Sequence, residues 1–535
     1  MKISSFKNIF PSATNAFLAL LSAILLILSF PDFEFWILAW VALVPLFSAI
    51  GREKEFWRKS FFLGWIFGTI FFFGTCWWLT FAPITYAQFP PLLAYILMFC
   101  VALTVGIFPA IFSALFSILL KRLGSYATLA APFLWTAIEF LRFSITGNNW
   151  NAIGYSHAFQ PILLSFAAFG GVYLTGFFII LFNSVVTFEF LQRYNREKPS
   201  KFVSIAGYLL AFSAIFAPVF LSLGNNSQNS ALPVSNVVAV QPNVPMSGIK
   251  YDDWTKLRDR HVQLAESALQ KFNEQRTTSN EQPAIIIFPE SPMIFMYSED
   301  SEFREFLTNF ASRNNAYILF NAAEPDAQSK HNFNSAVMIN PKGEKIAQYD
   351  KIHLLPFGEF QPLPDFLASE IPAFVGSFSF GNEFDLIPFG EAKGGVMICF
   401  ESHFASLSRE YAGRGADFLI EMTNDGYLGN TPVLRQHLAN SVFRAVETNR
   451  PLLRVTNVGV TAYINERGEV LDAADVYTEA TRVWTVAKSD AKSTFYVKYG
   501  DWFAWLCSIV SLALLFLSFR KRKINEQTNP ENIIS

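Results

Sequence analysis

The distribution of apolar residues along this 535-residue chain constrains its fold more than any other feature. Charged residues make up 16% of the chain, against about 25% in typical soluble domains. The deficit lies in residues 12–223 and 503–519, whereas residues 224–500 have the composition of an ordinary α/β domain. A chain divided in this way is expected to be a membrane protein with one large domain outside the bilayer.

A helix that spans a bilayer needs roughly 20 apolar residues. By that measure the sequence predicts an α-helical membrane domain of about eight spans. The first is retained, because no small-residue cleavage site follows it and further spans come at once. The predicted spans are residues 12–30, 35–50, 61–83, 92–120, 127–145, 160–190, 202–223 and 503–519. The predicted domains are a seven-helix membrane domain at 1–223, an α/β domain at 224–500, and the eighth helix with a basic tail at 501–535.

Basic residues predict the orientation of these spans, because Lys and Arg concentrate in cytoplasmic connections. Basic clusters precede the first span and follow the second, fourth, sixth and eighth. The connections at 31–34, 84–91 and 146–159 contain no Lys or Arg. Both termini are therefore expected in the cytoplasm, with residues 224–500 on the periplasmic side of a bacterial inner membrane.

Short β-branched runs alternate with amphipathic stretches after a polar linker at 224–233, which predicts a layered α/β domain. Predicted strands cover 237–241, 284–288, 316–321, 335–340, 395–400, 418–421, 452–455 and 462–465. Predicted helices cover 253–271, 302–313, 402–412 and 433–448.

Of the four cysteines, only Cys399 lies outside a membrane-length apolar run, since Cys76, Cys100 and Cys507 sit within such runs. It follows the β-prone run Val-Met-Ile and has no disulfide partner in its own domain. Domains outside the cell usually carry paired cysteines or none, because a lone thiol there is exposed to oxidation. A buried inert thiol is the alternative, but the setting favours a nucleophile.

Two other polar residues, Glu290 and Lys351, supply what such a nucleophile needs. Glu290 ends the run Ala-Ile-Ile-Ile-Phe-Pro, while Lys351 and Glu359 flank an apolar turn. Alone, Glu290 is more simply explained as a solvated strand-end residue and Lys351 as a solvated loop residue. A thiol with a pKa of about 8.5 needs a base, however, and Glu290 is the candidate. Lys351, with the backbone N–H after the nucleophile, can stabilise a tetrahedral oxyanion.

These segments resemble the Glu–Lys–Cys signatures of the nitrilase superfamily: Phe-Pro-Glu290, Asp-Lys351-Ile-His-Leu-Leu-Pro-Phe-Gly-Glu359 and Ile-Cys399-Phe-Glu401. Further matching segments are Thr-Asn-Asp-Gly-Tyr427, Arg-Ala-Val-Glu447-Thr-Asn-Arg-Pro and Arg-Val-Thr-Asn-Val-Gly459. The resemblance implies an αββα sandwich in which Cys399 is the nucleophile, Glu290 the general base and Lys351 the oxyanion stabiliser. It also implies that Glu359 supports the triad, with Phe400 and Glu401 beside the nucleophile.

The chain departs from that pattern at two positions. Phe400 stands where a Tyr is expected, so a hydroxyl contribution at that position is absent and only the backbone N–H is left. A Trp expected after the first strand has no counterpart at Lys250, and Trp254 is a substitute whose role the sequence leaves open.

A nitrilase-like domain on a multi-span membrane domain resembles the lipoprotein-modifying acyltransferase branch of that superfamily. The resemblance implies a ping-pong reaction through a Cys399 thioester. The acyl donor would be a membrane phospholipid, and the acceptor the α-amine of the N-terminal S-diacylglyceryl cysteine of an apolipoprotein. The expected protein is a monomer without cofactor or metal, and no basic tract indicates a nucleic-acid partner.

Two other functions fit parts of the pattern. A membrane-tethered amidase would use the same triad with water as the acceptor. A transporter or export scaffold would use the spans but leave Glu290, Lys351 and Cys399 unexplained, and it should tolerate Cys399→Ala.

Two further features have two interpretations each. The stretch Phe360–Phe380, which includes Phe366, Phe374, Phe378 and Phe380, is either a lid that enters lipid or ordinary packing over the core. Glu139 and Arg142 share a helix face near the outer end of the fifth span. Arg142 either binds a lipid headgroup or forms a structural pair with Glu139.

Overall fold

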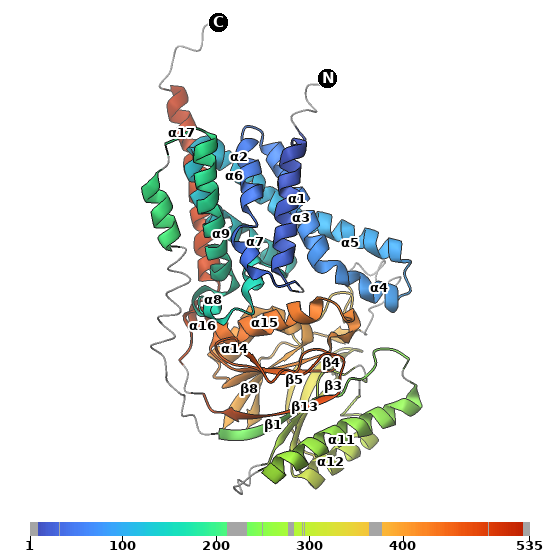
Figure 1. Ribbon diagram of the computed structural model, residues 1–535. Coiled ribbons are helices and arrows are strands. Elements are labelled where there is room, and N and C mark those ends of the chain that lie inside the picture. The colour runs from blue at the N-terminus through green and yellow to red at the C-terminus, as the bar shows by residue number, and fades with distance from the viewer. Residues whose placement is uncertain are drawn as a thin grey trace. The chain divides into compact units, whose positions relative to one another are not determined.

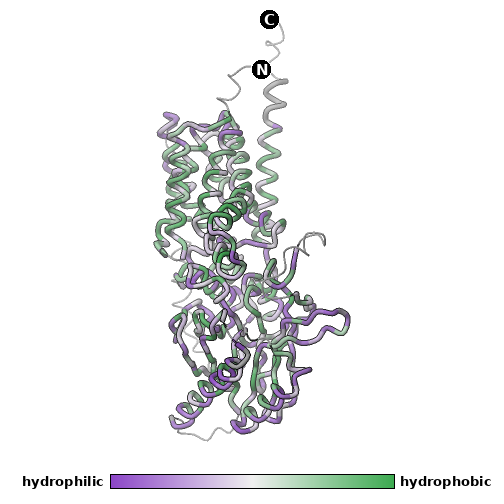
Figure 2. The backbone as a smooth tube through the Cα atoms, turned by 90° about the vertical axis from the view of Figure 1, so that its right-hand side faces the viewer, coloured by the Kyte–Doolittle hydropathy of each residue, from purple (hydrophilic) through white to green (hydrophobic). Residues whose placement is uncertain are grey.

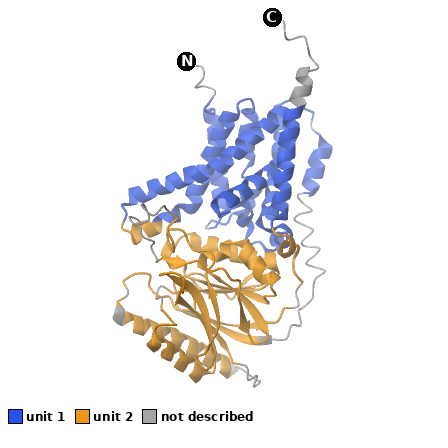
Figure 3. Cartoon of the chain, turned by 180° about the vertical axis from the view of Figure 1, so that it is seen from behind, with its two compact units in different colours: residues 1–80, 89–225, 501–535 blue, residues 81–88, 226–500 orange. Residues whose placement is uncertain are grey.

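The computed structural model describes residues 9–31, 33–198, 200–210, 233–248, 250–275, 283–291, 293, 295–362, 377–489 and 492–527 (Figure 1). The chain divides into two compact units (Figure 3). The helical unit comprises Met1–Thr80, Phe89–Asn225 and Asp501–Ser535. The sheet unit comprises Phe81–Gln88 and Asn226–Gly500. Figure 2 shows mainly hydrophobic residues along the long helices of the helical unit and alternating hydropathy in the sheet unit.

The helical unit contains segments that are apolar enough to cross a membrane. Among the described residues, four are also long enough: Trp57–Thr85, whose last five residues belong to the sheet unit, Pro91–Thr146, Ala167–Tyr194 and Trp502–Arg520. Its helices are α1 (Ala13–Ser29), η2 (Trp36–Trp40), α2 (Val44–Arg52), α3 (Trp57–Cys76), η3 (Trp77–Thr80), α5 (Pro91–Val105), α6 (Ile107–Leu123), η4 (Gly124–Ala130), α7 (Ala131–Thr146), η5 (Ile153–His157), α8 (Pro161–Leu164), α9 (Ala167–Tyr194) and α17 (Trp502–Gln527). The number of eight spans stays a prediction.

The predicted fourth span, 92–120, is two helices rather than one. α5 and α6 meet at Gly106, and Figure 1 shows α5 running away from the direction of α6. Small residues bring α6 close to α3: a Cβ atom at Gly68 would lie 2.9 Å from the Gly106 Cα, and one at Gly64 would lie 2.3 Å from the Pro109 carbonyl oxygen. Close backbone approach at small residues is the usual way in which membrane helices pack.

The predicted sixth span, 160–190, is also interrupted. Gly170 and Gly171 have non-helical backbone angles inside α9, and Gly171 has φ of +64°. Glycine adopts this left-handed conformation without the steric cost that a Cβ atom imposes. For the predicted seventh span, 202–223, the described part is an apolar helix at Lys201–Leu210, and residues 211–223 lie outside the described residues.

Two mixed sheets form the centre of the sheet unit. One has the strand order β13-β1-β2-β3-β4-β5, with β6 paired to β4, and the other has the order β12-β11-β10-β9-β8-β7. The strands are β1 (Pro233–Gln241), β2 (Ile285–Ile287), β3 (Tyr317–Pro325), β4 (Asn332–Ile339), β5 (Lys345–Asp350), β6 (Phe378–Ser379), β7 (Leu386–Phe389), β8 (Ala392–Ile398), β9 (Phe418–Thr423), β10 (Leu452–Thr456), β11 (Ala462–Ile464), β12 (Val470–Leu471) and β13 (Ala480–Ala487).

Helices cover the outer face of each sheet, as Figure 1 shows. The unit's helices are α4 (Phe81–Thr85), α11 (Tyr251–Gln275), α12 (Ser301–Asn314), η6 (Cys399–His403), α14 (Ala405–Gly413), η7 (Asp425–Leu428), α15 (Val433–Thr448) and α16 (Phe495–Tyr499). α11 and α12 share an apolar core with β1 to β4 that includes Val262, Phe310 and Ile286. α14 packs against β8, where a Cβ atom at Gly395 would lie 2.6 Å from Tyr411. The predicted αββα sandwich is therefore confirmed.

Candidate active site

The candidate residues come from strand ends in both sheets. β1, β2 and β3 run parallel in one sheet, and β8, β9 and β10 run parallel in the other. Glu290 follows β2 after Phe288 and Pro289, and Cys399 follows β8 directly. Lys351 follows β5, which is antiparallel to β4. Carboxyl ends of parallel strands are where α/β folds commonly place reactive groups.

Glu290, Lys351 and Glu359 form one buried ionic cluster. The Lys351 Nζ atom lies 2.8 Å from Glu359 Oε1 and 3.5 Å from Glu290 Oε1. The three side chains are 8%, 1% and 3% exposed, respectively. Glu359 Oε2 also accepts the Leu355 N–H at 2.7 Å, which closes the apolar turn between Lys351 and Glu359. The structure therefore brings these three predicted residues together.

Asn334 joins the two carboxylates, and the sequence analysis did not single it out. Its Nδ2 atom donates to Glu290 Oε1 at 3.0 Å and to Glu359 Oε1 at 2.7 Å. Asn321 in turn donates to Asn334 Oδ1 at 2.7 Å, which fixes the amide orientation. A sequence reader could have noticed Asn334 as a polar residue directly before the predicted strand 335–340, whose residues 336–339 are apolar. Asn334 holds the two carboxylates at a fixed spacing around Lys351.

Burial and charge within the cluster shift the pKa values of Glu290 and Lys351. Burial raises the pKa of Glu290; Lys351 opposes that shift, and the Glu359 carboxylate reinforces it. Burial alone would lower the pKa of Lys351, but Glu359 and Glu290 outweigh it and raise the pKa, so the ammonium stays charged. Glu290 is thus a carboxylate whose affinity for a proton is increased.

Cys399 occupies a conformation that is rare for a residue with a side chain. Its φ is +54°, in the left-handed region, where a non-glycine residue costs about 1–3 kcal/mol. Burial raises the pKa of the thiol well above its ordinary range, Glu290 adds to this, and Lys351 lowers it. The thiol is protonated at neutral pH, so a base has to accept its proton during attack. The influence of the Cys399 side chain on the pKa of Glu290, which it lowers against the larger effect of burial, indicates that the two groups are neighbours.

Glu401 connects the two loops that carry Lys351 and Cys399. Its Oε1 atom accepts hydrogen bonds from the Ile352 N–H at 2.7 Å, the His353 N–H at 3.0 Å and the Tyr349 hydroxyl at 2.7 Å. Its Oε2 atom accepts the Ile398 N–H at 2.8 Å. Burial raises the pKa of Glu401 to about 7, although these donors favour the carboxylate. Its contacts are those of a residue that holds two loops in register.

The other sequence-predicted residues lie around this cluster. The Phe400 ring stacks on His403, with centroids 5.4 Å apart. Trp254 of α11 packs edge-on against Phe295, with centroids 5.6 Å apart. Tyr427 packs against Tyr86, which follows α4 and donates to the Gly426 carbonyl at 3.3 Å. Residues 81–88 therefore contact the loop after β9.

The predicted lid is described only at its ends. Residues 363–376, which include Phe366 and Phe374, lie outside the described residues. Phe360 packs edge-on against Phe380, with centroids 5.1 Å apart, and Phe380 is half exposed. The Phe378 N–H donates to the Glu359 carbonyl at 2.9 Å. The end of this stretch is thus tied directly to the ionic cluster, and the choice between lid and packing stays open.

A second buried cluster behind Cys399 was missed in the sequence. His437 lies with Nδ1 2.6 Å from Asp425 Oδ1 and Nε2 3.0 Å from Glu421 Oε1. Arg454 pairs with Asp425 Oδ2 at 2.7 Å and also contacts Glu421 Oε2. The sequence does contain a hint of this cluster: His437 and Ser441 are four residues apart and therefore lie on one face of the predicted helix 433–448.

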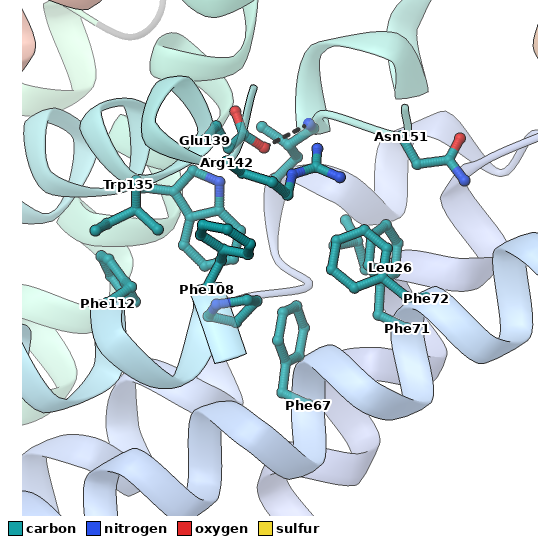
Figure 4. A pocket seen from close by; sticks show the side chains of 13 residues that line it. Leu26, Phe67, Phe71, Phe72, Phe108, Phe112, Trp135, Glu139, Arg142 and Asn151 are labelled. Atoms are coloured by element: carbon teal, nitrogen blue, oxygen red, sulfur yellow. Dashed lines mark hydrogen bonds between the residues drawn. The ribbon is translucent and has the colours of Figure 1, made fainter. Parts of the chain in front are cut away.

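Glu139 and Arg142 line a small pocket within the helical unit, which is otherwise walled mainly by aromatic and aliphatic side chains (Figure 4). Arg142 Nη1 donates to the Trp150 carbonyl at 2.9 Å, and its guanidinium lies 5.0 Å from the Phe72 ring centroid. Glu139 Oε1 accepts the Ile153 N–H at 2.9 Å. These contacts tie α7 to the loop after it, and both interpretations of Arg142, headgroup binding and a structural pair with Glu139, stay predictions.

The layered sheets and the Glu–Lys–Cys strand ends define a carbon–nitrogen hydrolase domain, the fold of the nitrilase superfamily, and residues 237–496 match the family model described as carbon-nitrogen hydrolase. Residues 22–185 match the model described as the apolipoprotein N-acyltransferase N-terminal domain. With relatives aligned over nearly its full length, the chain belongs to the apolipoprotein N-acyltransferase family.

Two relatives illustrate this similarity. The apolipoprotein N-acyltransferase of Geobacter metallireducens is 30% identical over 515 residues, which cover 95% of this chain and 96% of that protein. The one of Thermotoga maritima is 30% identical over 529 residues, covering 96% and 95%. The solved structure of Saccharomyces cerevisiae Nit3, from branch 10 of the nitrilase superfamily, is 20% identical and covers 48% of this chain and 91% of that chain, with a TM-score of 0.37.

Proposed function

We propose that this chain transfers an acyl chain from a membrane phospholipid to the α-amine of the N-terminal S-diacylglyceryl cysteine of an apolipoprotein. Family membership supports the reaction class. The observation that carries the assignment of residues is the buried cluster of Glu290, Lys351 and Glu359 near the strand end that presents Cys399. Phospholipid and lipoprotein both remain in the bilayer, which is why the reactive domain is attached to membrane helices.

The first half-reaction forms a thioester. The Cys399 sulfur attacks the carbonyl carbon of the sn-1 ester while Glu290 accepts the thiol proton. The oxyanion is stabilised by the Lys351 ammonium and the Phe400 backbone N–H. When the C–O bond breaks, the lysophospholipid oxygen takes the proton from Glu290. The products are a lysophospholipid and an acyl-enzyme, with Glu290 returned to its carboxylate form.

The second half-reaction releases the acyl chain. The neutral α-amine of the lipoprotein attacks the thioester carbonyl, and Glu290 accepts a proton from the nitrogen. The C–S bond breaks, the amide is complete, and the proton on Glu290 returns to the Cys399 sulfur. Both half-reactions use the same oxyanion donors, because each passes through a tetrahedral intermediate at the same carbon.

The spacing within the cluster supports different roles for the two carboxylates. The Lys351 Nζ atom lies 2.8 Å from Glu359 Oε1 but 3.5 Å from Glu290 Oε1. Glu359 is therefore the ion-pair partner of the ammonium. Glu290, the more weakly paired carboxylate with a raised pKa, is the one that can accept a proton.

The proposed placement follows from the distribution of basic residues. The domain at 224–500 lies on the periplasmic side of a bacterial inner membrane, the segments 1–223 and 501–535 provide the membrane helices, and both termini are cytoplasmic. The proposed catalytic residues all come from one chain, which is compatible with the proposed monomer.

The test is mass spectrometry of the purified full chain in detergent with phospholipid alone, then with a diacylglyceryl-cysteine peptide, with Cys399→Ala as the control. We expect a fatty-acyl mass on the peptide that contains Cys399, stable in water and transferred to the acceptor amine. Rapid discharge by water with no modified acceptor would indicate an amidase instead. Acyl transfer by the Cys399→Ala protein would contradict the mechanism.

A further inference from the structure

The backbone carbonyl oxygen of Cys399 has a polar contact with a buried histidine. His437 Nε2 lies 3.1 Å from the Cys399 carbonyl oxygen. The same nitrogen lies 2.9 Å from the Ser402 hydroxyl. His437 is only 4% exposed, and Cys399 has the left-handed backbone described above. A polar contact to this carbonyl therefore acts on a backbone conformation that is unfavourable by itself.

The peptide group between Cys399 and Phe400 carries that contact to the reaction. A trans peptide is planar, so its C=O and N–H point in opposite directions. A side chain that fixes the Cys399 carbonyl therefore fixes the direction of the Phe400 N–H on the other side of the plane. In the proposed function this N–H is an oxyanion donor. Rotation of the plane would remove it from the substrate.

We infer that His437 is a positioning residue, which holds the Cys399–Phe400 peptide so that the Phe400 N–H faces the oxyanion. This inference rests on the proposed function and assigns His437 no contact with substrate. The surrounding cluster suits the role, because Asp425 Oδ1 lies 2.6 Å from Nδ1 and Glu421 Oε1 lies 3.0 Å from Nε2. A side chain held at both ends transmits position better than one free to rotate.

The charge state of His437 follows from its neighbours. Facing it are Glu421 of β9, Asp425 of η7, Arg454 of β10, and the Ser402 hydroxyl of η6. Burial alone would lower the pKa of His437, but Asp425 and Glu421 outweigh it and raise the pKa to about 9. At neutral pH both ring nitrogens carry a proton: the Nδ1 N–H serves Asp425, and the Nε2 N–H faces the Cys399 carbonyl, the Ser402 hydroxyl and Glu421 Oε1.

The experiment compares full-length wild type, His437→Ala and His437→Gln, with Ser441→Ala as a matched control. Ser441 contacts Glu421 and Arg454 of the same cluster and donates to the His437 backbone carbonyl, but within its described residues the structure shows no hydrogen bond between the Ser441 hydroxyl and the His437 ring. Single-turnover acylation of Cys399 is measured with phospholipid and, separately, with p-nitrophenyl butyrate, alongside thermal unfolding. Gln places an amide N–H near the position of Nε2 without a titrating group.

We expect His437→Ala to slow acylation by roughly tenfold to a hundredfold, less than complete loss of an oxyanion donor, with KM changed less than about twofold. His437→Gln should recover much of the rate, and the ratio of wild-type to Gln rates should fall as pH rises through about 9. Ser441→Ala should lower thermal stability with a rate near that of wild type.

Two results would overturn the inference. One is a folded His437→Ala protein with wild-type acylation; the other is an equal loss of rate in Ser441→Ala, which would mean a purely structural role. Failure of the proposed function looks different: wild type would be acylated by p-nitrophenyl butyrate but not by phospholipid. The comparison of variants on the butyrate ester would still decide the role of His437.

Discussion

The sheet unit contains two buried ionic clusters that differ in their balance of charge. The cluster of Glu290, Lys351 and Glu359 places one ammonium against two carboxylates. The second cluster sets Arg454 and His437 against Glu421 and Asp425. In the first, burial and the surplus carboxylate raise the Glu290 pKa. In the second, burial is outweighed by Arg454 and His437, and the pKa of Glu421 falls to about 2.

This difference separates reactivity from rigidity. A surplus of negative charge leaves one carboxylate ready to accept a proton, which general base catalysis needs. A balanced set keeps every member ionised and fixed in place, so it can hold a backbone but cannot exchange protons near neutral pH. The four predictions below test this contrast, starting with the largest expected effect.

Replacement of the nucleophile should have the largest effect on the reaction and little effect on the fold. We expect Cys399→Ala to reduce acyl transfer by roughly 10⁴-fold or more, since no other nucleophile lies at this strand end in the proposed mechanism. The thermal unfolding temperature should change little. Alanine has a Cβ atom like cysteine, so the left-handed backbone at position 399 keeps its cost, and only one sulfur atom is lost. Quantification of acylated peptide measures the rate, and a Cys399→Ala protein with appreciable turnover would refute the mechanism.

The two carboxylates of the first cluster should be unequal. Glu290→Gln removes the proposed base and should slow acylation by roughly 10²-fold to 10⁴-fold. Glu359→Gln leaves the base but releases Lys351 to pair with Glu290, which lowers the Glu290 pKa, so we expect a smaller loss with the acid limb of the rate profile moved to lower pH. Single-turnover acylation across pH measures both, and equal losses with unshifted profiles would contradict the assignment.

Loss of a cation from the second cluster should affect stability more than rate. Arg454→Met leaves Glu421 and Asp425 paired only by His437, and removal of one partner of a buried ion pair costs about 3–5 kcal/mol. We expect the folded fraction to keep an acylation rate within about tenfold of wild type. Denaturant titration with a parallel active-site labelling assay separates the two effects. A larger loss of rate than of stability would show that this cluster takes part in chemistry.

The second cluster should also shape the pH dependence of stability. The raised His437 pKa contributes stability that is fully present below about pH 6.5 and is lost as pH rises through about 9. The lowered pKa of Glu421 contributes stability above about pH 4.3 that is lost as pH falls toward about 2. Thermal unfolding from pH 4 to 10 should show an alkaline decline that is weaker in His437→Gln. An identical decline in both proteins would argue against a charged His437.

Sequence reasoning succeeded where chemistry coincides with a strand end. Glu290 and Cys399 each follow an apolar run, so their placement at strand ends was predictable. Asn334 and His437 were not, because both lie inside elements whose pattern indicates packing. Their partners come from other elements, and only the folded sheet order brings Asn334 to Glu290 or His437 to Cys399.

Among the helices and strands, too, local sequence patterns predicted some elements correctly and missed others. The α15 helix matches its predicted range of 433–448, since caps and periodicity are local. The strands β5 and β13 were missed, because Lys345–Asp350 is polar on both faces and Ala480–Ala487 is only partly buried at a sheet edge. The break of α9 at Gly171 was missed as well, since hydropathy does not report backbone angles.

The most direct test of the contrast between the two clusters is the pH dependence of single-turnover acylation of Cys399 by phospholipid, in wild type and Glu290→Gln. If the surplus carboxylate makes Glu290 the proton acceptor, the wild-type rate rises with pH through a value above the ordinary Glu pKa of about 4.3. That limb should then be absent in the variant. A Glu290→Gln protein with the same limb and the same rate would contradict the account, and the base would have to be sought elsewhere.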